Sequence, residues 1–337
     1  MAPLSFGGGY MTTTTAKIKA VTNIKTKSQI KFIIILFAVL VLCDILTAGK
    51  LLRFGNIVYI IAHSIFYTFV SWGMIFIFTT GITDLSIGAN VILAANIGAI
   101  CAMDLGMGYV GLIFVTVIAA ACFELLSVMC SIGLRIPSWI SGLGMTLIFE
   151  AILDIYAAHR AVTVGSNVIT LSKFRALGNI PVMILFLVAG FIVSYILFNR
   201  TTLGFNIAAV GGNQEVAKAM GIKIKKTIIT GAFVGGLLIG IGGLLQVSYV
   251  GKMYPQSGMS SLSTIFRSLA ILLLGQSFSN IFTMPVSVLI CGILVNGLFN
   301  FLTMMGVPSG TGQEMCLGAL VIVCGIISHW KYRGVVK

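Results

Sequence analysis

Long apolar runs, separated by short polar or Gly/Pro-containing stretches, follow one another along most of the chain. The runs are too long for strands and lack a two-residue alternation, so each is predicted to be a helix of about 20 residues, which is the length that spans a bilayer. A peptide backbone in lipid must satisfy its own hydrogen bonds, which excludes isolated strands. The predicted fold is therefore an all-α integral membrane protein with about ten transmembrane helices, at residues 30–48, 57–79, 83–101, 108–131, 138–157, 179–198, 227–249, 262–279, 283–303 and 312–329.

Composition supports membrane insertion. Of the 337 residues, 58% are hydrophobic and 9% charged, whereas about a quarter of the residues in soluble domains are charged. The net charge of +13 comes from basic residues placed between apolar runs, where lipid headgroups and the positive-inside rule explain them better than nucleic acid does. A ten-span arrangement puts 14 of the 21 lysines and arginines on one side. Both termini are therefore predicted to be cytoplasmic.

The chain divides into a cytoplasmic tail at residues 1–29, a transmembrane domain at 30–331 and a short cytoplasmic tail at 332–337. Its seven cysteines lie in or beside apolar segments and show no metal-ligand spacing, so they are predicted to be small buried hydrophobes. The sequence contains no G-x-x-x-x-G-K-[ST] phosphate loop and no nucleophile elbow. We therefore expect no cofactor on this chain and no ATP hydrolysis by it, and a membrane-embedded enzyme lacks a catalytic set.

Two predicted spans depart from an ordinary lipid-facing helix. The third is polar and glycine-rich, and is expected to line a cavity or to be broken, because such backbone is tolerated at membrane depth only where protein shields it from lipid. Its polar residues include Asp84, Ser86, Asn90 and Asn96. The seventh carries glycines three and four residues apart, a spacing that favours close helix packing, at Gly231, Gly235, Gly236, Gly240 and Gly243.

The longest inside loop, 199–226, contains a predicted short amphipathic helix. Asn213 can cap its first turn, Glu215 suits the positive N-terminal end, and Gly221 can adopt the left-handed conformation that ends it. The predicted apolar face consists of Val216, Ala217 and Met220. A helix of two turns is unstable alone in water, so it must dock either on the membrane and the chain's own helices or on a cytoplasmic partner.

Two motifs carry a resemblance to a known family. The run Gly81-Ile-Thr-Asp-Leu-Ser-Ile-Gly88 resembles the Gly-Ile-Asp-Leu-Ser-Val-Gly motif of permeases in bacterial ABC importers for ribose, xylose and related sugars. The run Ala209-Val-Gly-Gly-Asn-Gln-Glu-Val-Ala217, followed by Met220-Gly-Ile-Lys223, resembles that family's cytoplasmic segment and is the more specific match. Thr202-Leu-Gly204, Pro255 and Leu274-Gly275 follow in the family's order, so the resemblance covers about residues 57–330.

The resemblance implies a vitamin-B12-permease-like fold of about ten helices, a dimer of permease subunits and an extracytoplasmic solute-binding protein. It also implies two cytoplasmic ATPases, which hold ATP and Mg²⁺. In such importers the loop helix sits in a groove of the ATPase, and this role falls here on Gly212, Asn213, Glu215, Ala217, Met220 and Gly221. The solute expected from the resemblance is a monosaccharide or a sugar-like molecule.

One stretch departs from the family's pattern. An acidic position is Arg267 here, and a glycine pair is replaced by Gly275-Gln276. Either the solute differs from a neutral pentose, or this subunit is one half of an unequal permease pair. Nucleoside permeases of related architecture show an Asn-Ile-Gly-x-Glu-Gly run where this chain has Asp84 to Gly88, which favours sugars without excluding nucleosides.

Several polar and aromatic residues are candidates for the translocation path, because sugars are recognised by aromatic faces, amides and carboxylates in a concave site. They are Trp72, Asp84, Ser86, Asn90, Asn96, Trp139, Gln246 and Arg267. Each also has a structural interpretation: Asp84 as a helix cap, and each tryptophan as packing or an interface anchor.

The remaining acidic residues indicate a second candidate function. Glu150 and Asp154 lie one turn apart, close in sequence to His159, Arg160 and Lys173, and Glu124 is placed to pair with Arg135. We expect both sets to be structural ion networks, but intramembrane carboxylates also occur in ion-coupled secondary transporters, which is the alternative mechanism.

Overall fold

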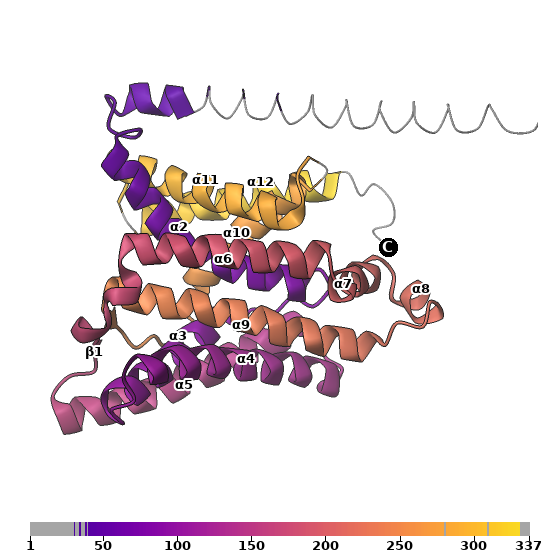
Figure 1. Cartoon of the computed structure of the whole chain (residues 1–337), viewed down its shortest axis with the longest axis horizontal. Coiled ribbons are helices and arrows are strands. Elements are labelled where there is room, and N and C mark those ends of the chain that lie inside the picture. The colour runs from indigo at the N-terminus through magenta and orange to yellow at the C-terminus, as the bar shows by residue number, and fades with distance from the viewer. Residues whose placement is uncertain are drawn as a thin grey trace, which may run out of the picture.

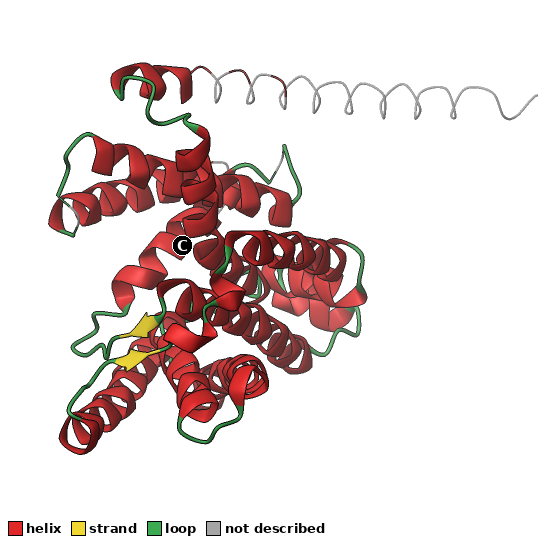
Figure 2. Cartoon of the chain, turned by 60° about the vertical axis from the view of Figure 1, so that its left-hand side comes forward, coloured by secondary structure: helices red, strands yellow, loops and turns green. Residues whose placement is uncertain are grey.

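The protein is described by a computed structural model that covers residues 30, 34, 38, 40–279, 281–308 and 310–330, without the side chains of 324, 325 and 327–330. The predicted tails, 1–29 and 332–337, lie outside the described residues, as does most of the first predicted span; residues 40–46 at its end are helical. Helices dominate the described part, as Figure 2 shows. Their bounds are α2 Phe54–Phe78, α3 Ile87–Met103, α4 Gly108–Leu134, α5 Ser138–Val164, α6 Ile180–Asn199, α7 Thr202–Gly212, α8 Gln214–Ala219, α9 Ile224–Val250, α10 Leu262–Ser277, α11 Met284–Met304 and α12 Thr311–Trp330, with short 3-10 turns at Ser172–Phe174 and Ala176–Gly178.

The all-α membrane architecture is confirmed. Helices α2 to α6 and α9 to α12 coincide with the nine predicted spans after residue 50. Within the described residues, six helices are long and apolar enough to cross a membrane, namely α2, α4, α5, α6, α9 and α11. The apolar helices α3, α7 and α10 and the searched part of α12 are shorter.

Helix α9 is the central packing element and lies against both α2 and α4. A Cβ atom on Gly235 would approach the carbonyl oxygen of Gly73 in α2 to 2.7 Å, and one on Gly240 would approach Cα of Val117 in α4 to 2.8 Å. Such distances leave no room for a side chain, so the glycine stripe permits the close helix contacts that the sequence predicted. Trp72, Phe69 and Phe76 fill the core beside it and are fully buried.

The polar third span is broken before it becomes helical. Helix α2 ends at Phe78, and α3 begins only at Ile87. We call the intervening residues 79–86 the α2–α3 break. The backbone N–H of Thr83 donates to Ser138 Oγ at 3.0 Å, and a Cβ on Gly142 would meet the backbone nitrogen of Leu85 at 2.5 Å. Helix α5 therefore shields this irregular backbone from lipid.

A small feature was not predicted. Strand β1, Ile169–Thr170, pairs antiparallel with β2, Lys252–Met253, so that Ile169 faces Met253. The two strands lie in the connections after α5 and α9, at the end of the molecule opposite α8 (Figure 1). Helix α9 runs between the two ends, and its 27 residues span about 40 Å.

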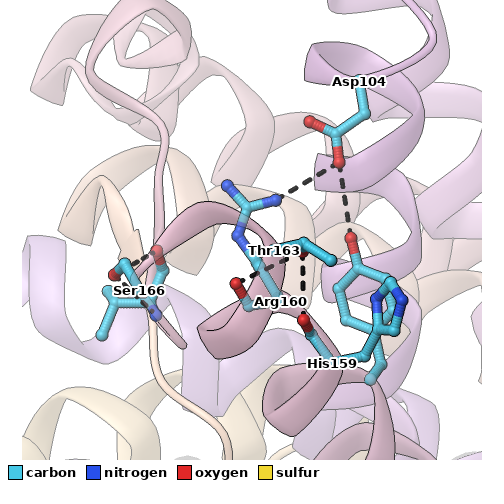
Figure 3. A network of polar contacts seen from close by, with 7 residues as sticks. Asp104, His159, Arg160, Thr163 and Ser166 are labelled. Carbon is cyan, nitrogen blue, oxygen red and sulfur yellow. Dashed lines mark hydrogen bonds and ion pairs between the residues drawn. The ribbon is translucent and has the colours of Figure 1, made fainter.

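Near the strands, an ion pair ties α5 to the turn between α3 and α4 (Figure 3). Arg160 Nη1 lies 3.3 Å from Asp104 Oδ2, and the Tyr156 hydroxyl donates to the same oxygen at 3.4 Å. The sequence predicted an ion network of Arg160 with Glu150 and Asp154. This prediction is wrong for Arg160, because it pairs with Asp104 in the turn between α3 and α4. Because Asp104 is 45% exposed, this pair contributes little to stability.

Candidate translocation site and coupling segment

Helix α8 has the caps that the sequence predicted. Asn213 Oδ1 accepts hydrogen bonds from the backbone N–H groups of Glu215 and Val216 at 2.9 and 3.1 Å. Gly221 has φ +82°, a left-handed conformation that glycine adopts without strain. Glu215 lies in the first turn and Lys218 in the last, which suits the helix dipole. The local sequence therefore specifies a short helix with fixed ends.

The faces of α8 differ in part from the prediction. Ala217 is fully buried and packs into the protein's own core, whereas Val216 and Met220 are 53% and 62% exposed. The predicted grouping of these three residues on one docking face is thus wrong for Ala217. Residues 216 and 220 are one helical turn apart. Together they form an exposed apolar pair, which we call the α8 apolar face.

The segment before α8 packs directly on the α2–α3 break. A Cβ atom on Gly211, near the end of α7, would overlap the carbonyl oxygen of Thr79, which begins the break. Gly212, the next residue, has open space around its Cα. A displacement of α8 therefore reaches the break through α7 without an intervening loop.

The break leads into a buried polar cluster formed by Asp84, Ser86, Asn90, Glu124 and Ser127, each at most 1% exposed. Asp84 Oδ1 accepts from the Ser86 N–H at 2.7 Å, and Ser86 Oγ donates to Ser127 Oγ at 3.0 Å. Asn90 Nδ2 donates to Glu124 Oε2 at 2.9 Å. The predicted pairing of Glu124 with Arg135 is therefore wrong, since Asn90 takes that place.

Three oxygens of the cluster lack a donor in the described part of the chain, namely Asp84 Oδ2, Asn90 Oδ1 and Glu124 Oε1, although the carboxyl groups of Asp84 and Glu124 interact with each other. Two facing acceptors repel unless a proton or a donor lies between them. We therefore expect Glu124→Gln to preserve or raise stability, because its amide can donate to Asp84 while its oxygen still accepts from Asn90. Glu124→Ala should lower the unfolding free energy by about 2–3 kcal/mol, through the cavity and the unpaired Asn90 amide. Thermal unfolding in detergent compares the two variants; equal losses for both would contradict this account of the cluster.

Two cavities lie on either side of Tyr67, towards the end of the molecule that holds the strands. The first measures about 190 Å³ and includes Gln246, Lys252 and Gln256 in its lining, and the second measures about 110 Å³. Tyr67 and Thr264 line both cavities. The second is lined by Tyr67, Ser263, Thr264, Arg267, Phe299, Gly310, Gln313, Glu314 and Leu317.

Arg267 is the charged centre of the smaller cavity. Its guanidinium carbon lies 4.7 Å from the ring centroid of Tyr67 and 4.0 Å from that of Phe299, and Nη1 donates to the Tyr67 hydroxyl at 3.1 Å. The cation therefore makes cation–π contacts with two aromatic rings. Sequence analysis missed Tyr67, Phe299 and Gln313, because no local pattern marks them and only the fold brings them to Arg267.

The other candidate path residues have different surroundings. Trp72 is fully buried, and its Nε1 donates to the carbonyl oxygen of Pro285 at 3.0 Å. Asn96 donates to its own helix at the carbonyl oxygen of Ile92, and Trp139 is 51% exposed at the start of α5. Of the predicted path residues, only Gln246 and Arg267 line the two cavities flanking Tyr67.

Glu150 has a structural task. Its carboxylate accepts hydrogen bonds from the backbone N–H groups of Met259 and Ser261 at 2.7 and 2.9 Å. Met259 has φ +65°, so the carboxylate holds a strained turn just before α10. The start of α10, and with it Arg267, is thereby fixed against α5.

Comparison with known proteins decides the family. Residues 56–325 match the profile of the family described as the permease component of the branched-chain amino acid transport system. The chain belongs to this family. It is a multi-pass permease component of the bacterial inner membrane, and the resemblance found in its motifs is confirmed.

Curated relatives align along most of this permease. It is 26% identical to the ribose import permease protein RbsC of Escherichia coli strain K12 over 303 residues, which cover 87% of the chain and 91% of that protein. It is 25% identical to the galactose/methyl galactoside import permease protein MglC of Haemophilus influenzae over 328 residues, covering 91% and 95%. A nucleoside ABC transporter permease protein of Lactococcus lactis shares 34% identity over 108 residues, 32% of the chain and 28% of that protein. No solved structure gives a significant match.

Proposed function

We propose that this permease forms the translocation path of an ATP-binding-cassette importer for a monosaccharide or a sugar-like solute. It crosses the membrane about ten times with both termini in the cytoplasm. It works with a second permease subunit, cytoplasmic ATPases and an extracytoplasmic binding protein. ATP and Mg²⁺ bind to the ATPase subunits, and the permease holds no cofactor of its own.

The exposed apolar face of the capped helix α8 carries the proposal. Val216 and Met220 lie more than half exposed on a helix of six residues that is too short to fold without support. An ATPase groove would cover them. Support for a sugar comes from the two relatives that align along most of their length, which are named as import permeases for ribose and for galactose.

The contacts support a route for coupling. Closure of the ATPases moves α8, α7 transmits the movement to Thr79 through Gly211, and the break carries it to the start of α3. The cluster around Asp84 and Glu124 joins that point to α4. The solute cavities beside Tyr67 lie at the other end of α9, so the energy input and the solute site are separated along the membrane normal.

Two observations favour second candidates. The nucleoside permease matches a third of the chain, which supports a nucleoside as the solute. The buried carboxyl pair Asp84 and Glu124 supports proton coupling in place of ATP.

Uptake by proteoliposomes that contain the permease, its ATPase and its binding protein tests the solute class. Labelled ribose or galactose should be taken up, and unlabelled sugar should compete. Competition by a nucleoside but by neither sugar would replace the sugar assignment with the nucleoside one.

A further inference from the structure

Arg267 has no carboxylate partner within 4.0 Å among the residues that the structure describes. The sequence contains eight acidic residues, all within the described part, and among them only Asp104 forms an ion pair within 4.0 Å of a cation, namely Arg160. Arg267 lies in the second turn of α10 and contacts Tyr67 of α2, so its charge lies within the bundle of membrane-spanning helices. A cation in that position is costly unless something balances it.

The contacts of Arg267 leave part of it available to a ligand. Its guanidinium carbon lies over the rings of Tyr67 and Phe299, and one of its five N–H groups donates to the Tyr67 hydroxyl. Among the described residues this is the one hydrogen bond found for the guanidinium, so other N–H groups remain to bind a carboxylate with two parallel hydrogen bonds. The contacts with Tyr67 and Phe299 restrain the guanidinium before any ligand arrives.

The cavity walls suit a polyhydroxylated ligand. Ser263, Thr264 and Gln313 line the smaller cavity together with Arg267. Across Tyr67, the larger cavity adds Gln246 and Lys252, a second cation. Amides and hydroxyls of this kind hydrogen-bond to sugar hydroxyls.

We propose that the solute is a sugar acid, whose carboxylate binds Arg267 while its hydroxyl groups contact Gln313 and the hydroxyl-bearing side chains beside it. This inference rests on the proposed importer function and narrows its solute class. The single acid in the cavity wall, Glu314, favours a monoanion over a doubly charged phosphate, because it repels the second charge.

Binding of D-galacturonate and D-galactose to the purified full chain in lipid nanodiscs tests the proposal. The two sugars differ in one group, a carboxylate against a hydroxymethyl, and ligand-observed NMR titration measures weak affinities of both. We expect galacturonate to bind at least about tenfold more tightly than galactose, as a charge-assisted bidentate contact in a desolvated site predicts. Arg267→Gln should abolish that preference and leave the affinity for galactose within about twofold.

Arg53→Gln is the matched control. It removes the same charge from an exposed position at the start of α2 and should keep the preference for galacturonate. Equal binding of both sugars by the unmodified chain, or a preference that survives Arg267→Gln, would overturn the proposal. If glucose 6-phosphate bound more tightly than galacturonate and displaced it, the choice of a carboxylate over a phosphate would be overturned. None of these results bears on whether ATP drives uptake, so the importer assignment stands or falls separately.

Discussion

Aspartates in place of Val216 and Met220 are expected to release the ATPase from the permease while the membrane fold remains intact. Each apolar side chain is more than half exposed, and covering one completely contributes about 1.5–3 kcal/mol. Because both side chains are already partly buried, losing the two contacts lowers the affinity at least about tenfold, since about 1.4 kcal/mol corresponds to a factor of ten. Copurification of the ATPase from detergent extracts and permease-stimulated ATP hydrolysis measure the loss.

Lys218→Ala provides the control for this double variant. Lys218 is an exposed residue of the same helix, two positions from Val216 and therefore on a different face. It should leave copurification close to that of the unmodified chain. An ATPase that copurifies normally with the double aspartate variant would show that α8 rests on lipid or on the chain's own helices, and would contradict its role in docking.

Alanine at Gly211 and at Gly212 should change stability in opposite directions. A methyl group at Gly211 overlaps the carbonyl oxygen of Thr79 and should destabilise the protein by about 1–3 kcal/mol, as overpacking does. At Gly212 the space is open, so alanine should stabilise the helix by up to about 1 kcal/mol through its higher propensity. Thermal unfolding of the two purified variants measures the difference.

The same pair of variants tests the coupling route. Gly211→Ala should also reduce solute uptake per ATP hydrolysed, by about tenfold if a displacement of α7 of the order of an ångström misplaces the α2–α3 break. Gly212→Ala should transport normally. Normal coupling in the Gly211 variant, despite its lower stability, would show that the contact with Thr79 is packing alone.

The helices and the caps of α8 were predictable because each depends on local chemistry. Span length and apolar runs fix the helices, and Asn213 and Gly221 act on their immediate neighbours. The break before α3 was predictable for the same reason, since its polar and glycine residues stand together in the sequence.

The partners of buried polar groups were not predictable, because they come from distant segments. Glu150 binds a turn 109 and 111 residues away, and Arg267 contacts a tyrosine 200 residues earlier. Glu124 accepts a hydrogen bond from Asn90 and does not pair with Arg135, although Arg135 is nearer in the sequence. Ala217 is buried because α8 packs on the hydrophobic core of the same chain. The helical periodicity of the sequence cannot indicate that contact.

The source of energy for uptake tests the central claim most directly. Proteoliposomes with the permease, its ATPase and its binding protein are supplied with ATP and Mg²⁺ on the ATPase side, with and without a protonophore. The account predicts that uptake requires both ATP and the ATPase, and that it continues when the protonophore collapses the proton gradient. Uptake that proceeds without the ATPase and stops when the gradient collapses would contradict it, and would assign the buried pair Asp84 and Glu124 to proton coupling.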